Sequence, residues 1–307
     1  MTTVEVSSTG DTKLERVMRR VRSVGFVGAV AFYVKSYFPN ITNTNVPFFD
    51  RLHNVFDVNS DRYRQPWEIY TLWEKTLGTV RLRAHTSDIH TLVEMRGNMY
   101  TIPEVFNRDR FPSVYLIDLG SNIGLATKKI YIQLRRLGIN VPRMILVEPD
   151  PGNITFSREN LSRIEGIEQI EAAISNTNET RILTYPSGIK GTDSYSIRVE
   201  GKGTPVNCIT LKEVTSDVSL PIILKVDIEG AENDFLDIPD IDKVLVNVQL
   251  IFIEDHTGNH VIKELKEYDF AKVDKTLRSL GFTQLGQDNK DRVYIRARDD
   301  SNVRPTA

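Results

Sequence analysis

The chain has 307 residues, of which 40% are hydrophobic and 26% charged, an ordinary globular composition that excludes disordered, collagenous and coiled-coil proteins. Its 39 lysines and arginines against 41 aspartates and glutamates give a formal net charge of −2, so no global charge points to nucleic acid or to an anionic membrane. The single cysteine, Cys208, cannot form an internal disulfide, which favours a reducing, cytoplasmic location.

The first part of the chain carries no self-sufficient motif. Residues 1–10 are small and polar, and we expect them to be disordered. The longest apolar run, residues 24–34, has 11 residues, whereas a membrane-spanning helix needs roughly 20. We therefore expect no membrane span, but a helix packed on the core or a peripheral membrane contact through residues 24–38.

Residues 66–77 have large apolar side chains at helical spacing and are followed by Gly78, which predicts a helix that packs its aromatic residues into the core. The side chains that carry this pattern are Trp67, Tyr70, Trp73 and Leu77. Residues 79–83 alternate like a strand, and residues 86–88 offer caps for a helix through Met95. Residues 1–78 are thus predicted to be a mostly helical extension.

From residue 113 short apolar runs alternate with amphipathic helices, as in an α/β protein with a parallel sheet. Strands are expected at residues 114–119, 144–147, 222–226 and 248–253. Helices are expected at residues 123–137, ended by Gly138, at residues 151–161, capped by Asp150, and at residues 271–280. An antiparallel insertion is expected at residues 176–210, with strands at 181–185 and 194–199, and a terminal hairpin at residues 282–297.

A glycine turn, Asp-Leu-Gly-Ser-Asn-Ile-Gly at residues 118–124, lies where the first of these strands meets a helix. Open parallel sheets bind ligands at such places, and the backbone N–H groups of the turn favour an anionic group. The spacing departs from the dinucleotide fingerprint Gly-x-Gly-x-x-Gly, and Asp118 stands two residues before the first glycine. This favours a ligand with a positive amino group, such as S-adenosylmethionine, although a plain tight connection is the alternative.

Charged residues also end the next strands. Glu148 ends the second strand, where a carboxylate can accept both hydroxyls of an adenosine ribose. Residues 225–232 bring charged groups to the end of an apolar strand, which is costly unless they face the crevice or form a network with Lys225. His256 could accept a proton near neutral pH, or could simply be a polar residue at a strand end.

Taken in order, four motifs resemble the FkbM family of S-adenosylmethionine-dependent methyltransferases. They are Asp-Leu-Gly-Ser-Asn-Ile-Gly at 118–124, Glu-Pro-Asp-Pro at 148–151, Leu-Lys-Val-Asp-Ile-Glu-Gly-Ala-Glu at 224–232 and Glu-Asp-His at 254–256. The resemblance covers residues 79–298, leaves 1–78 unmatched and leaves 299–307 as a polar tail. It implies a Rossmann-like class I methyltransferase fold: a seven-stranded, mostly parallel sheet with an antiparallel terminal hairpin.

The resemblance also implies site residues, carried over by position. The methionine part of the cofactor would contact Asp118, Gly120, Asn122 and Gly124, with Ser121 contributing its backbone. Glu148 would bind the ribose, with Pro149 counted among the cofactor contacts, Ala173 and Ile174 would flank the adenine, and Asp227 would lie beside the reacting centre.

Methyl transfer from a sulfonium mainly needs alignment of donor and acceptor, and an alcohol acceptor must also lose its proton. The candidate bases are His256 and Asp227, and Glu254 completes the candidate catalytic group. We assign no metal ligands, although Asp227 with Glu254 or Asp255 could hold a magnesium ion.

The leading prediction is an O-methyltransferase that acts on a hydroxyl of a small molecule or glycan, with no nucleic-acid partner. Its acceptor pocket would come from residues 1–112 and 176–210. An alternative is a non-catalytic S-adenosylmethionine-binding or interaction protein that keeps the fold and uses its first hundred residues as an interface. A nicotinamide enzyme is a third hypothesis, which the missing second glycine argues against. The sequence does not indicate the oligomeric state.

Overall fold

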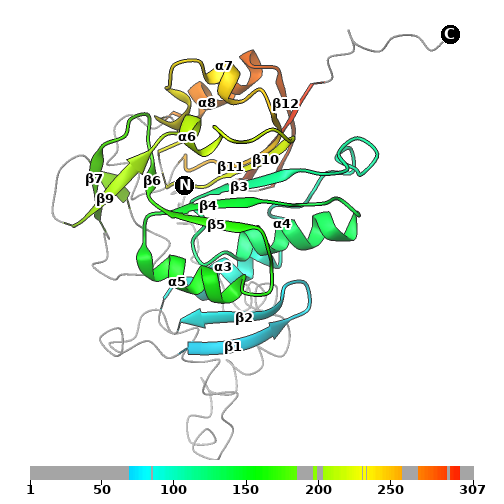
Figure 1. Cartoon of the computed structure of the whole chain (residues 1–307), viewed down its shortest axis with the longest axis vertical. Helices are drawn as coiled ribbons and strands as arrows, with labels where there is room; N and C mark the ends of the chain where they lie inside the picture. The colour runs from blue at the N-terminus through cyan, green and yellow to red at the C-terminus, as the bar shows by residue number, and fades with distance from the viewer. Residues whose placement is uncertain are drawn as a thin grey trace, which may run out of the picture. The chain divides into compact units, whose positions relative to one another are not determined.

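A computed structural model (Figure 1) describes residues 69–83, 86–184, 196–198, 203–229, 231–232, 234–257, 269–288 and 291–297. The expectations for residues 1–68 and 299–307, including the apolar run at 24–34, lie outside the described residues. Within the described ranges, no helix has the length and apolar character needed to cross a membrane. The chain divides into two compact units, Met1–Tyr70 with Arg83–Gly97 and Thr71–Leu82 with Asn98–Ala307.

In the first unit, helix α3 (Asp88–Met95) begins at a buried ion pair. The Asp88 carboxylate accepts hydrogen bonds from Arg83, including one from Nε at 2.9 Å and one from the Arg83 backbone N–H at 2.7 Å. Both side chains are fully buried. The predicted helix is confirmed. The capping of its first turn differs from the usual N-cap pattern. Ser87 stands at the N-cap but makes no side-chain capping hydrogen bond, whereas the Thr86 hydroxyl accepts a hydrogen bond from the Asp88 N–H.

The second unit contains a seven-stranded sheet with the order β12-β13-β11-β10-β3-β4-β5. The strands are β3 (Tyr115–Leu119), β4 (Met144–Glu148), β5 (Ile167–Glu171), β10 (Ile222–Val226), β11 (Val248–Glu254), β12 (Phe282–Asp288) and β13 (Asp291–Arg296). Pairing is parallel from β5 to β11, and β13 is antiparallel to both of its neighbours. Strands β4 and β10 are buried along their whole length, as continuous apolar runs predict.

The helices begin and end where their capping residues stand. They are α4 (Leu125–Arg136), α5 (Pro151–Asn160), α6 (Leu211–Val214), α7 (Ile241–Val244), α8 (Phe270–Ser279) and the 3₁₀ turn η3 (Asp234–Leu236). Asp150 caps α5 by accepting the Asn153 N–H at 3.0 Å, and Gly138 follows α4 with a φ of +73°. The apolar face of α8 packs through Val273 and Leu277 into the sheet core.

Smaller strands follow the end of β5. Strands β6 (Ala173–Ile174), β7 (Thr180–Thr184), β8 (Ser196–Arg198) and β9 (Thr204–Ile209) form a four-stranded sheet of order β6-β9-β7-β8. Strand β7 pairs antiparallel with both β8 and β9, which confirms the predicted antiparallel insertion. The parallel pairing of Ala173 with Cys208 joins this insertion to β6, directly after the main sheet.

The helix predicted for residues 66–77 is wrong wherever that segment is described. Strand β1 (Ile69–Glu74) forms a two-stranded sheet with β2 (Gly78–Arg83), which is the strand predicted at 79–83. β-Branched and aromatic residues favour a strand here, and the tight turn ends at Gly78, whose φ is +72°. Trp73 is 75% exposed instead of making the predicted core contact.

Removing the cap of α5 should lower stability measurably. The change Asp150→Ala deletes the acceptor for the Asn153 N–H and should lower the free energy of unfolding by about 1 kcal/mol. The matched control is Asp150→Asn, because asparagine caps about as well as aspartate. Urea unfolding of both variants tests this prediction, and equal losses of stability in both would contradict the capping role.

Candidate active site

The turn after β3 touches the end of β10, and only glycine allows this approach. Gly120 has a φ of +76°, and a Cβ placed on it would lie 1.8 Å from the carbonyl oxygen of Asp227. The Asp227 N–H in turn donates to the Leu119 carbonyl at 3.1 Å. A side chain at position 120 would therefore push apart the two strand ends that carry the first and third sequence motifs.

Glu148 joins the same turn to the next strand. Its fully buried carboxylate accepts hydrogen bonds from the Asn122 N–H at 2.8 Å, the Asp150 N–H at 2.9 Å and Asn153 Nδ2 at 3.2 Å. Asn122 itself has a left-handed φ of +47°. Glu148 thus lies against the glycine turn, as two neighbouring parallel strands require, and its ribose contact stays a prediction.

Gly124, the last residue of the turn, is required by helix packing. Its φ is +80°, and a Cβ there would lie 2.7 Å from Ser157 Oγ and 2.9 Å from Leu161 Cδ1. It stands at the N-cap of α4. Gly124 therefore allows α4 to pack closely on the segment of α5. Ser121, also named from the sequence, is buried and donates its N–H to the Val147 carbonyl at 3.1 Å.

A small cleft, partly open to solvent, lies beside this turn. It is lined by Gly120, Val147, Pro149, Ala172, Ala173, Ile174, Ile228 and Ala231. Four of the residues that the sequence nominated for cofactor contact, Gly120, Pro149, Ala173 and Ile174, meet here. Sequence reasoning missed the others. Ile228 and Ala231 could have been found as the apolar positions within the charged 224–232 motif.

Asp118 lies beneath the turn and not in the cleft wall. The parallel register of β3 and β10 sets Asp118 beside Lys225, and Asp118 Oδ1 lies 3.1 Å from Lys225 Nζ. The other oxygen, Oδ2, accepts a hydrogen bond from the Thr127 hydroxyl. The Asp118 side chain is fully buried. This arrangement makes Asp118 a support for the turn, and its predicted contact with the methionine part remains a prediction.

Lys225 ties three groups together. Its Nζ donates to the Gly120 carbonyl at 2.6 Å and also lies 3.4 Å from Asp227 Oδ2. Burial alone would lower the pKa of Lys225, but the negative charges of Asp118 and Asp227 outweigh it and hold that pKa above its usual value. The Lys225–carboxylate network that the sequence offered as an alternative is therefore present.

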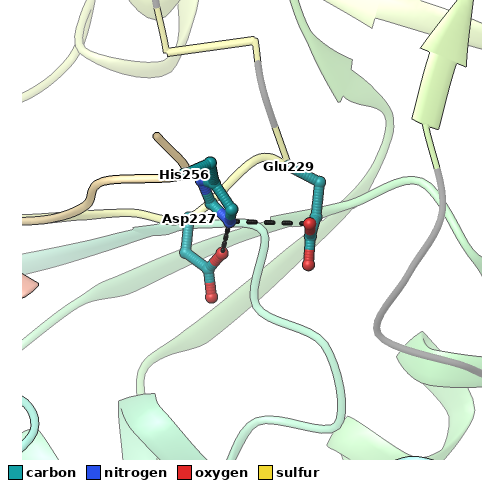
Figure 2. A group of neighbouring side chains, drawn as sticks. All are labelled: Asp227, Glu229 and His256. Carbon is teal, nitrogen blue, oxygen red and sulfur yellow. Dashed lines mark ion pairs between the residues drawn. The ribbon is translucent and has the colours of Figure 1, made fainter. Parts of the chain in front are cut away.

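Figure 2 shows the group at the ends of β10 and β11, where His256 directs Nε2 at two carboxylates. Nε2 lies 3.6 Å from Asp227 Oδ1 and 3.5 Å from Glu229 Oε2, while Nδ1 lies 3.0 Å from Glu232 Oε1. Glu254 Oε1 is 3.9 Å from Nε2. The structure thus brings together the three candidate catalytic residues of the sequence, and adds two glutamates.

Asp255 is directed elsewhere. Its Oδ2 accepts from Arg292 and its Oδ1 accepts the Thr257 N–H at 2.9 Å. These bonds hold the pKa of Asp255 below its usual value even though burial alone would raise it. The pairing with Arg292 argues against the alternative in which Asp255 shares a magnesium ion with Asp227.

A comparison with protein-family models matches residues 118–283 to the methyltransferase FkbM domain, which is more than half of the chain. The chain belongs to the FkbM methyltransferase family. The match begins at Asp118 and contains the glycine turn, the cleft and the His256 group. Together with the observed sheet, it confirms the predicted Rossmann-like class I methyltransferase fold. The boundary predicted at residue 79 stays a prediction.

Solved structures similar to this FkbM-family chain include an FkbM methyltransferase from Methylobacillus flagellatus KT, to which it is 14% identical. The match covers 64% of this chain and 47% of the Methylobacillus protein, with a TM-score of 0.42. The chain therefore spans about half the length of that protein. Another is the S-adenosylhomocysteine-bound Podospora anserina methyltransferase PaMTH1, with 12% identity, coverage of 70% and 80%, and a TM-score of 0.37. None of the curated proteins matches the chain.

In this FkbM-family chain the charge of His256 follows from its surroundings. Burial alone would lower the pKa of the imidazole. The hydrogen bond and the negative charge of Glu232 oppose this effect, and so do the negative charges of Glu229 and Asp227, which face Nε2. Together they outweigh burial and raise the pKa of His256 to about 10. With no metal bound, this raised pKa favours the protonated imidazole at neutral pH. The base roles suggested for His256 and Asp227 both stay predictions, of which the raised pKa of His256 favours Asp227.

NMR of the imidazole in EDTA-containing buffer should show His256 titrating near pH 10. The change Glu232→Gln should lower that pKa, because it removes the charge nearest to Nδ1. Since the folded pKa exceeds the ordinary 6.5, the protonated histidine stabilises the fold fully below about pH 6.5, and this contribution is lost as pH rises through about 10.

The change His256→Gln should therefore cost more unfolding free energy at about pH 6 than at about pH 10.5. Urea unfolding at both values measures the difference. A histidine that titrates between about pH 6 and 7 would show that the carboxylates do not hold the proton.

Proposed function

We propose that this chain is an S-adenosylmethionine-dependent methyltransferase that methylates a hydroxyl group of a small molecule or glycan. The observation that carries the proposal is that two features lie close together at one edge of the sheet. An apolar cleft lies beside a glycine turn, and a group of carboxylates with a histidine stands at the ends of the adjoining strands. Open α/β sheets bind ligands at this edge.

The residues present fit the cofactor. Apolar walls from Pro149, Ala173 and Ile174 suit a flat adenine ring, and Glu148 lies buried beside them at the end of β4. Partly exposed carboxylates near the cleft, such as that of Asp227, suit a cationic ligand. When bound, S-adenosylmethionine would supply a methyl group carried by a positively charged sulfur.

The protein's own contribution would be orientation and proton handling. Gly120 and Ile228 would help to hold the donor, because both line the cleft. Asp227 is 25% exposed and is held by Lys225 at one oxygen and by His256 at the other. Its fixed carboxylate is the group that would take the proton of an acceptor hydroxyl.

Isothermal titration should show saturable binding of S-adenosylmethionine, and Ala231→Leu should weaken it at least about tenfold by filling part of the cleft. The matched control is Ala271→Leu, on an exposed position of α8. It should bind like the wild type, with both variants checked for folding by circular dichroism.

Absence of binding by the intact chain, or equal affinity in both variants, would overturn the assignment of the cleft. Turnover is measured separately, as S-adenosylhomocysteine release in a panel of hydroxylated small molecules and glycans. Binding without release across that panel would contradict O-methylation and support the non-catalytic alternative.

A further inference from the structure

We propose that Asp227, Glu229 and His256 form a binding site for a divalent first-row metal ion, of which Mn²⁺ best matches two carboxylates and one imidazole. The site is a local property of the ends of β10 and β11. Its use in catalysis, as a holder of the acceptor oxygen, rests on the proposed function.

The three ligand atoms are spaced for one ion. One ligand atom from each residue lies within 4.8 Å of the others, and Nε2 of His256 is 3.6 Å and 3.5 Å from its two carboxylate neighbours. Ligands bound at about 2.1 Å lie about 3 Å apart when adjacent and about 4.2 Å apart when opposite. Small side-chain movements would therefore complete the coordination. Carboxylates suit Mg²⁺ and Mn²⁺, and an imidazole shifts the preference toward first-row transition metals.

A second observation comes from Glu232, which lies behind the histidine. Its side chain is fully buried, and Oε1 lies 3.0 Å from His256 Nδ1 and also accepts the Ile228 N–H at 3.1 Å. The other oxygen, Oε2, is buried and has no hydrogen-bond partner in the part of the chain that the structure describes. Histidines that bind metals typically donate their second N–H to such a carboxylate, which orients the ligating nitrogen.

The site borders the cleft. Ile228, between the two carboxylate ligands in the chain, lines the cleft, and Gly120 lies against the Asp227 carbonyl. With an ion bound, Asp227 would be a ligand instead of the base, and the ion could bind the oxygen of an acceptor hydroxyl next to the methyl donor and favour loss of its proton to solvent.

The test uses the full chain, stripped of metal with EDTA and then titrated with MnCl₂ while unbound Mn²⁺ is followed by EPR. We expect saturable binding of about one ion per chain, weakened at least about tenfold by Glu229→Gln. The matched control, Glu168→Gln, removes an exposed acid of β5 that pairs with Arg143, and it should change nothing. Pulsed EPR of the bound ion should show a nitrogen coupling that His256→Gln abolishes.

The absence of saturable binding up to about 1 mM Mn²⁺, or equal affinity in Glu229→Gln and Glu168→Gln, would overturn the site. Glu229 is 21% exposed, so its variant keeps the test valid if the buried His256→Gln fails to fold. S-adenosylmethionine binding is titrated on the same samples. Manganese binding without cofactor binding would refute the proposed function and leave the metal site standing, whereas the reverse result would refute only the metal site.

Discussion

A single buried ammonium group holds the site together. Lys225 is 2% exposed, so its charge depends on Asp118, on Asp227 and on the carbonyl of Gly120, all within 3.4 Å of Nζ. Removing one partner of a buried ion pair typically costs about 3–5 kcal/mol, because the other charge is left uncompensated. The network therefore fixes the end of β10 against the turn after β3, and both the cleft and the acidic group are positioned by that contact.

Two environments with opposite properties meet at this contact. On one side the cleft is walled by small and apolar side chains such as Ala173 and Ile174. On the other side carboxylates surround His256 and hold it as a cation or, as we propose, share a metal ion with it. Because the segment containing Asp227 and Ile228 contributes to both sides, a ligand in the cleft and a cation at the strand ends would lie close together.

Local patterns in the sequence were sufficient for most of the fold. Continuous apolar runs located β3, β4, β10 and β11, and Asp150 and Gly138 marked helix ends, because burial and capping act on neighbouring residues. The same reasoning was wrong at residues 69–74, where aromatic spacing suits either a helix or a strand. Pairing with β2 decided the conformation there, and pairing is not a local property.

The sequence by itself determined the family, the order of the strands along the chain and which four motifs end at the same edge of the sheet. Only the tertiary structure decided which charges face one another. In the tertiary structure Asp255 pairs with Arg292, Asp118 is buried beneath the turn, and Glu232 lies against His256, where its negative charge raises the pKa of the imidazole. The physical reason is that hydrophobic and capping patterns repeat over a few residues, whereas the energy of a buried charge depends on groups brought near it by strand register and loop packing.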